Sequence, residues 1–314
     1  MLTSRRLNIF PALCIACCML FSELRAQKGY NYEYGVMTGI SNYLGEIGGM
    51  EKDGRGFISD LKLAKTRWNE SVFFKYRFHP MFAFRMALNY LRIEGDDKLS
   101  TNIGRRYRNL NFRNDIFDAE GTVQWMFFNT NKPTGIYSRA SIYLSAYVFT
   151  GIGVFTNNPT TVYQGSRIAL RPLKTEGVDY SAFGICVPMG AGFYVTVNRH
   201  RRAHRFGIEF NWRYTNTDRL DDISSATWAN PSTLTSATAA ALNNRNPELG
   251  TNQPAGVSKN YGWYDDGHGN NINKAPRGNP KNKDSFISVN ISYSVVMKGR
   301  FTRSRGKKIR SAKF

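Results

Sequence analysis

The sequence predicts an all-β protein, an eight-stranded antiparallel transmembrane β-barrel. Three observations carry this prediction: a leader typical of exported proteins, an apolar–polar alternation that recurs with aromatic residues along the chain, and connections that alternate between short and long. The alternation is clearest over residues 286–295, where Ile287, Val289 and Ile291 are separated by Ser288 and Asn290. Because successive side chains of a strand point to opposite faces, such a strand has one apolar and one polar face.

Residues 1–26 are predicted to be a signal peptide. Two arginines precede an apolar run from Leu7 to Phe21, and Ala26 offers a small residue for cleavage. The apolar run is shorter than the roughly 20 residues that a membrane-spanning helix needs. An uncleaved anchor and a lipoprotein signal at Cys17 remain alternatives.

The charge balance narrows the choice of partners. The chain carries a formal net charge of +20. In an exported protein, such an excess favours lipopolysaccharide, other outer-membrane lipid head groups or acidic proteins over nucleic acid. Cys186 is the only cysteine after residue 26, so we expect no internal disulfide in the exported chain. No cysteine–histidine spacing resembles a zinc site, and we expect neither a metal nor a cofactor.

After the leader, no apolar stretch is long enough for a membrane helix, so any crossing must use strands that close into a barrel. Eight strands are expected, at residues 30–44, 69–79, 81–94, 114–129, 138–155, 180–197, 205–217 and 284–297. The connections are short at 79–80, 129–137 and 198–204, and long at 45–68, 95–113, 156–179 and 218–283. Outer-membrane barrels place short turns in the periplasm and long loops outside. We therefore expect a barrel domain at 27–297 in the outer membrane, with both termini in the periplasm.

The period of two assigns the faces of the first four strands. The side chain of Glu33 is expected to face inward from the first strand, and those of Lys75 and Arg77 from the second. The third strand points Phe82, Phe84, Met86, Leu88 and Tyr90 outward and Arg85 inward. The fourth points Phe117, Val123, Trp125 and Phe127 outward, with Asp118 and Glu120 inside. Each strand thus has a lipid face and a lumen face.

Two of the later strands complete the pattern. The sixth contains three glycines and Pro188, which predicts a bulge or a local break in pairing. The seventh points Phe206, Ile208, Phe210, Trp212 and Tyr214 outward, with Glu209 and Arg213 inside. In the connection that follows, a short capped helix is expected to begin within 218–228, and residues 232–246 are expected to be flexible.

The inward charges are expected to form a structural ion-pair network. An eight-stranded barrel is only wide enough for its own side chains to fill, and unpaired charges in so narrow a space are costly. The lumen is therefore predicted to be filled rather than to conduct. The predicted network contains four cations and four anions: Glu33, Lys75, Arg77, Arg85, Asp118, Glu120, Glu209 and Arg213.

Two basic clusters are expected on the periplasmic face, one in the last short turn and one in the tail 298–314. Like charges at this density remain extended until a counter-charge arrives. Solvated clusters that meet lipid head groups are one interpretation, and docking of an acidic partner is the other. The candidate partner-binding residues are Arg199, His200, Arg201, Arg202, His204, Arg205, Lys298, Arg300, Arg303, Arg305, Lys307 and Lys308. An external set, Arg105, Arg106, Arg108 and Arg113, is expected to meet lipopolysaccharide phosphates.

The histidines predict no catalytic site. His268 beside Asp265 and Asp266 is the one candidate for a nucleophile–base arrangement or a calcium loop, but it lacks the spaced ligands of a calcium loop. We expect the protein not to be an enzyme, and a surface hydrolase is kept as an alternative.

Three segments resemble the PorG family of outer-membrane barrels. They are residues 39–49 (Gly-Ile-Ser-Asn-Tyr-Leu-Gly-Glu-Ile-Gly-Gly), 217–224 (Thr-Asp-Arg-Leu-Asp-Asp-Ile-Ser) and 277–284 (Arg-Gly-Asn-Pro-Lys-Asn-Lys-Asp). They occur in the family order and span nearly the whole exported chain, whereas the basic tail and the Ser/Thr/Ala/Asn-rich insertion depart from the family pattern.

The resemblance implies a role in the type IX protein secretion system. It implies an accessory integral membrane protein that contacts the periplasmic ring formed by the lipoprotein PorK and its partner PorN. A filled barrel is not itself a conduit for protein, so docking or anchoring of the ring is the expected work. A small outer-membrane porin or transporter is the alternative.

Overall fold

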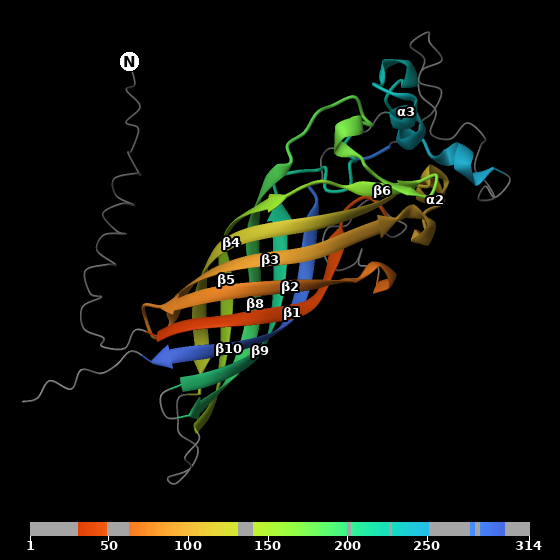
Figure 1. The fold of residues 1–314 in the computed structure, drawn as a ribbon. Helices are drawn as coiled ribbons and strands as arrows, with labels where there is room; N and C mark the ends of the chain where they lie inside the picture. Colours follow the sequence, from red (N-terminus) through yellow and green to blue (C-terminus); the bar gives the residue numbers. More distant parts are fainter. Residues whose placement is uncertain are drawn as a thin grey trace, which may run out of the picture.

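The computed structural model describes residues 31–48, 63–130, 141–199, 202–225, 228–250, 277–279 and 283–298. Eight long antiparallel strands form a closed barrel (Figure 1). Their bounds are β1 Asn31–Leu44, β2 Arg67–Arg77, β3 Phe82–Asp96, β4 Asn111–Asn129, β5 Ser141–Thr156, β8 Phe183–Arg199, β9 Arg202–Thr215 and β10 Ser285–Lys298. Each bound lies within three residues of the expected one, and the predicted fold class is confirmed.

Closure comes from two pairings. Neighbouring strands pair in the order β3-β2-β1-β10-β9-β8-β5-β4, and the additional pairing of β3 with β4 completes the ring. The first and last strands pair along their whole length, from Asn31 opposite Lys298 to Leu44 opposite Ser285. No strand of the ring therefore has an unpaired edge, as a barrel in lipid requires.

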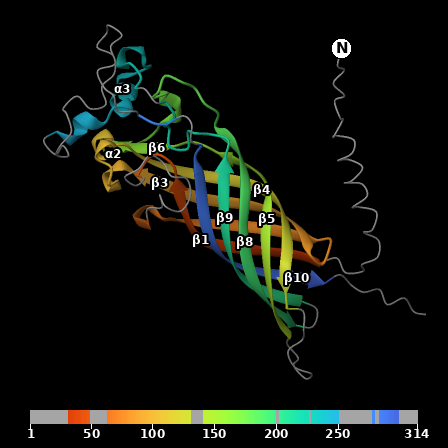
Figure 2. The same ribbon diagram turned by 180° about the vertical axis from the view of Figure 1, so that it is seen from behind.

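The two ends of the barrel differ. One end carries the short connections 78–81, 130–140 and 200–201, together with the start of β1 and the finish of β10; we call it the turn end. The opposite end, which we call the loop end, carries the other described connections between the strands. The turn end and the loop end lie at opposite ends of the barrel in both ribbon views (Figures 1 and 2).

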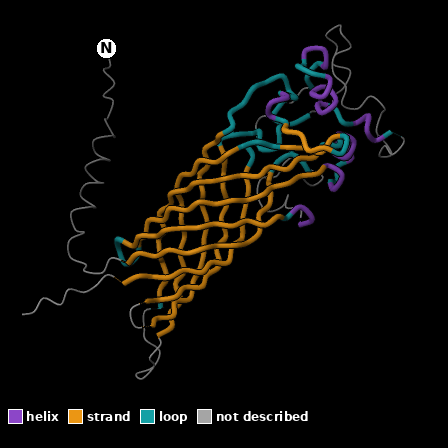
Figure 3. Tube along the Cα trace, viewed as in Figure 1, coloured by secondary structure: helices purple, strands orange, loops and turns teal. Residues whose placement is uncertain are grey.

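Short elements gather at the loop end, where helices and loops stand beyond the strands (Figure 3). They are the hairpin β6 Thr160–Tyr163 with β7 Ser166–Ala169, the α-helices α2 Ile103–Arg108 and α3 Ala237–Asn243, and the 3₁₀ helices η2 Leu63–Lys65, η3 Asp97–Leu99, η4 Arg171–Leu173, η5 Pro231–Thr233 and η6 Asn246–Leu249. Side-chain caps start both α-helices: Asn102 accepts a hydrogen bond from the Arg105 amide, and Ser236 accepts one from Ala239.

Two local expectations need correction. Residues 218–225 form no helix, whereas α3 lies inside the stretch 232–246 that was expected to be flexible. The carboxylates of 218–222 are buried, and those of Asp221 and Asp222 bond to Tyr43 and Thr175, whereas Ser236 supplies the cap that begins α3. The local break in pairing expected at Pro188 is confirmed: pairing of β8 with β5 is interrupted there without a change of register. A register shift occurs between Trp125 and Phe128 of β4.

The outer wall of the barrel is apolar. Val72, Met86, Leu88, Ile152 and Ile291 are each more than half exposed, and each alternates with buried or half-buried neighbours on its strand. A continuous apolar surface of this kind is unfavourable in water and matches the lipid-facing band of a membrane barrel. Among the described residues, no helix combines the length and the apolar character needed to cross a membrane.

Aromatic side chains border the apolar wall at both ends. Near the loop end, the rings of Trp68 and Tyr90 lie 5.2 Å apart, and the rings of Tyr90 and Phe117 lie 5.0 Å apart. Near the turn end, the rings of Tyr32 and Tyr76 stack at 5.4 Å. Such rows at two levels are typical of the aromatic girdles that meet the two membrane interfaces.

Candidate functional site

The middle of the lumen is filled by a buried ion-pair network. Arg85 of β3 donates to Glu209 of β9 at 2.5 Å and to Glu120 of β4 at 3.2 Å. Arg213 of β9 contacts Asp118 at 2.7 Å and the other oxygen of Glu120 at 3.3 Å. Glu120 therefore links the two arginines into one network that joins three strands. We call this set the central layer.

Neutral side chains complete the central layer. The Tyr147 hydroxyl donates to Glu209 at 2.6 Å, and Asn89 donates to Asp118 at 3.1 Å. The Arg85 guanidinium lies 4.8 Å from the centre of the Phe149 ring. Arg85 is only 1% exposed, so water does not replace these partners. Buried charges are tolerated only when they are paired in this way.

A second group lies in the lumen at the turn end. Glu33 of β1 accepts from Lys75 at 3.4 Å, from Ser294 at 2.6 Å and from Arg205. Arg77 donates to the Tyr194 hydroxyl at 2.6 Å, and no carboxylate contacts it within the described part of the chain. We call Glu33, Lys75, Arg77 and Arg205, with Tyr194, the turn-end cluster.

The structure corrects the expectation for Arg205. This residue was assigned to the exposed partner-binding turn, but β9 begins at Arg202 and Arg205 points into the lumen, where it is buried. Its guanidinium pairs with Glu33 and packs over the Tyr194 ring at 4.6 Å. Arg205 has the same parity as Glu209 and Arg213, so the alternation already contained this signal.

The other candidate partner-binding residues are placed unevenly. Arg202 is exposed at the start of β9, and His204 bonds to Tyr293 at 2.9 Å on the outer wall. Arg199 ends β8 and Lys298 ends β10, and their side chains are not described. The remaining candidates lie outside the described residues: His200, Arg201, Arg300, Arg303, Arg305, Lys307 and Lys308.

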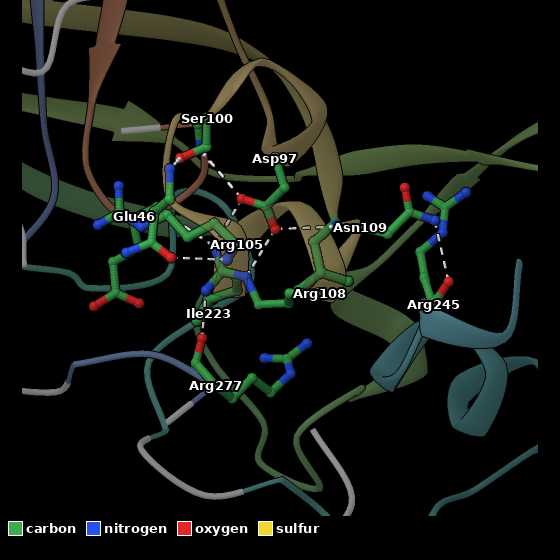
Figure 4. Close-up of polar contacts among 12 residues, drawn as sticks. Glu46, Asp97, Ser100, Arg105, Arg108, Asn109, Ile223, Arg245 and Arg277 are labelled. Carbon is green, nitrogen blue, oxygen red and sulfur yellow. Dashed lines mark hydrogen bonds and ion pairs between the residues drawn. The ribbon is translucent and has the colours of Figure 1, made fainter. Parts of the chain in front are cut away.

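The loop end is closed by a second polar network that the sequence did not predict. Arg108 of α2 is buried and donates two hydrogen bonds to the Asp97 carboxylate, of 2.7 and 2.9 Å. The same guanidinium donates to the carbonyl of Glu46 at 3.1 Å and to the carbonyl of Arg277 (Figure 4). One side chain therefore joins three connections that are far apart in the sequence. Arg108 is thus not available to lipopolysaccharide, contrary to expectation.

Glu176 forms the second junction of this cap. It pairs with Arg277 and, at 2.9 Å, with Arg219, and it accepts from the amides of Ser224 and Ser225. Beneath it, an apolar cluster of the barrel wall and loops includes Tyr43, Phe112, Leu220, Ile223 and Leu242. We use the term loop cap for the residues joined by Arg108 and Glu176.

A third junction joins three segments that are far apart in the sequence, 39–49, 217–224 and 277–284. The Tyr43 hydroxyl lies 2.8 Å from Asp221 and 2.7 Å from Asp284. A hydroxyl has one hydrogen to donate, so the second short contact requires a protonated carboxyl group that donates to Tyr43. Burial raises the pKa of Asp284 well above its ordinary value and raises that of Asp221 to about 7.

These groups predict that the loop cap is more stable at pH 5.5 than at pH 8. Burial also raises the pKa of Asp218 and of Glu46 to about 7 and that of Asp222 to about 6. The folded cap then binds more protons than the unfolded chain from about pH 4 to pH 7, so its stability falls as the pH rises through this window. The pKa of Glu176 is lowered despite its burial, mainly because Arg277 and Arg219 lie beside it. Its titration therefore changes the stability of the cap only below this window.

Amide hydrogen exchange tests this dependence. Protection factors of 219–225 should fall roughly tenfold between pH 5.5 and pH 8 after correction for intrinsic rates, whereas those of the β2–β3 ladder should not change. Asp221→Asn should flatten the profile. A cap whose protection is constant or increases over this range contradicts the assignment of protonated carboxyl groups.

The described residues contain no cluster of metal-binding side chains. No group of three or more histidine, cysteine, aspartate or glutamate side chains there has metal-binding geometry. His268, Asp265 and Asp266, the alternative hydrolase or calcium group, lie outside the described residues.

Comparisons with known proteins give a family. No curated protein matches the chain. Among solved structures, Neisserial surface protein A is 9% identical, with a TM-score of 0.32, and the match covers 87% of this chain and 98% of that protein. Ail, the attachment invasion locus protein of Yersinia pestis, in complex with the heparin analogue sucrose octasulfate, gives 9% identity and the same TM-score, over 87% of this chain and all of Ail. A family profile matches residues 10–243, and the chain belongs to that family, which is described as a domain of unknown function, DUF6089.

Proposed function

We propose that this protein is a non-enzymatic outer-membrane anchor that docks the periplasmic PorK/PorN ring of the type IX secretion system. The observation that carries the proposal is the difference between the two ends of the barrel. The loop end is closed by buried ion pairs, and the lumen is filled, whereas the turn end carries excess positive charge. A protein-sized substrate has no path through such a barrel, which leaves its ends for function.

The predicted leader and the loop lengths support this orientation. Barrels of the outer membrane have short periplasmic turns, so the turn end faces the periplasm in our proposal. The three PorG-like segments meet at the loop cap, where Asn279 donates to Glu46, and Asp284 bonds to the Tyr43 hydroxyl and accepts from the Leu220 amide. These contacts support the resemblance to PorG in architecture. Docking is assigned to the turn end because of the charge at that end.

Ring recovery from membranes tests the proposal. Arg199, Arg201 and Arg202 are replaced by serine, and Arg205 is kept because it pairs with Glu33. We expect recovery of PorK and PorN with the tagged barrel to fall several-fold, and the loss to be larger at low salt than at high salt because exposed charges are screened. A matched variant replaces Lys98, Arg106 and Arg167, three exposed cations of the loop end, by serine. Equal recovery by the two variants contradicts docking at the turn end.

The porin alternative is less well supported by the geometry. The central layer places five charged side chains across the lumen, and each is almost fully buried. A solute path requires that these pairs separate, which leaves buried charges without partners.

A further inference from the structure

The turn-end cluster has three cations and one carboxylate. Tyr194 lies at its centre: Arg77 donates to its hydroxyl at 2.6 Å, the Arg205 guanidinium lies 4.6 Å from its ring centre, and Lys75 Nζ lies 5.2 Å from it. Glu33 bonds to Lys75 and Arg205 and has no contact with Arg77. The formal charge of these side chains is therefore +2.

The central layer does not neutralise this excess. Its carboxylates Asp118, Glu120 and Glu209 are engaged by Arg85 and Arg213. Cation–π contacts with Tyr194, Phe73 and Tyr147 soften the excess, but a ring face does not cancel a full charge. The uncompensated cation is Arg77, which no carboxylate contacts among the described residues.

Arg77 is the group best placed to receive a ligand. It lies at the last position of β2, at the turn end, and it is half-buried. Its Nη2 is held by the Tyr194 hydroxyl and by Met126 Sδ, whereas its buried Nε has no acceptor. An unpaired buried donor on a cation is costly, and an anion at this edge of the guanidinium removes the cost.

The chain's own segments at this end do not supply that anion. The connections 78–81, 131–140 and 200–201 and the segment 299–314 contain no aspartate or glutamate, and the last of these is strongly basic. The counter-charge must therefore come from another molecule. Because an eight-stranded lumen admits only side chains, the anion has to be carried on a slender stem.

We propose that the turn end of the lumen is a receptor site for a carboxylate side chain of an acidic protein segment, bound by Arg77 beside Lys75 and Arg205. The inference rests on the proposed function, because it gives the chemistry by which a periplasmic partner is recognised. A carboxylate matches the fork of a guanidinium, and a glutamate stem reaches into the lumen, whereas lipid head groups lie outside the wall.

Binding of hexaglutamate to the full-length barrel in detergent tests the site. We expect Arg77→Gln to weaken binding roughly tenfold or more, because one charge-assisted hydrogen bond is lost. Arg106→Gln makes the same change of charge at an exposed position of the loop end and should leave binding unchanged. Arg77→Lys should restore part of the affinity. Heat-modifiable electrophoretic mobility establishes that each variant is folded.

Three results overturn the proposal. The first is absence of hexaglutamate binding to the wild-type protein, and the second is equal weakening by Arg77→Gln and Arg106→Gln. The third is displacement of hexaglutamate by equimolar inorganic phosphate, which shows a general anion site. Ring recovery is measured separately with the same variants. A ring that is not recovered by the wild type contradicts the docking function, while hexaglutamate binding still decides the lumen site.

Discussion

Replacing Arg85 by methionine should lower the free energy of unfolding of the barrel by about 3–5 kcal/mol. Arg85 is the only cation that contacts Glu209 among the described residues, and it shares Glu120 with Arg213. Without it, Glu209 keeps only the Tyr147 hydroxyl as a hydrogen-bond partner in a site that excludes water. The measurement is urea unfolding in lipid vesicles, followed by tryptophan fluorescence.

A double variant separates lost charge pairing from lost packing. Arg85→Met combined with Glu209→Gln removes both charges, so much of the lost stability should return. Asp179→Asn, which removes the exposed partner of Lys174, should leave the unfolding transition unchanged. If Arg85→Met unfolds at the wild-type urea concentration, the central layer does not stabilise the barrel.

Replacing Arg108 by alanine should open the loop cap and leave the barrel intact. The side chain makes hydrogen bonds to Asp97, to the Glu46 carbonyl and to the Arg277 carbonyl, and all of these groups are buried. Its removal leaves a buried carboxylate without a cationic partner, with the amides of Gly48 and Leu110 among its remaining donors. We expect the opening free energy of the cap to fall by about 3–5 kcal/mol.

Hydrogen exchange at α2 and at 219–225 measures this opening. Arg106→Ala removes an exposed arginine from the same helix and should change nothing. Arg108→Lys should fail to rescue the cap, because one ammonium does not reproduce the paired bonds to Asp97. Exchange in the Arg108→Ala variant that matches the wild type excludes this arginine as the junction of the cap.

The strands were predictable because their signal is local. Alternation with a period of two depends only on neighbouring residues. In a closed barrel with a filled lumen, each strand has one apolar outer face and one polar inner face, so the same pattern holds along each strand. The outward side chains Phe84, Met86 and Leu88 are exposed as expected, and Arg85 is buried between them. Arg205 was misplaced because it was assigned from the basic run around it. Its odd position in the alternation of β9, which it shares with Glu209 and Arg213, places it in the lumen.

The loop cap was not predictable by the same reasoning. Its junctions join residues such as Tyr43 and Asp284, or Arg108 and Arg277, that are separated by more than 160 positions. Such contacts have no period along the chain, and their charged members resemble ordinary solvated loop residues. The expected helix within 218–228 failed for this reason, because Asp221 and Asp222 are used in buried contacts instead.

Ion conductance in planar lipid bilayers tests the central claim most directly. A barrel whose lumen is filled by the central layer and the turn-end cluster should give no steady current at moderate voltage, in the wild type and in the Arg108→Ala variant alike. Steady conductance of the wild-type protein that scales with salt concentration would contradict the account, because it shows a water-filled path through the barrel.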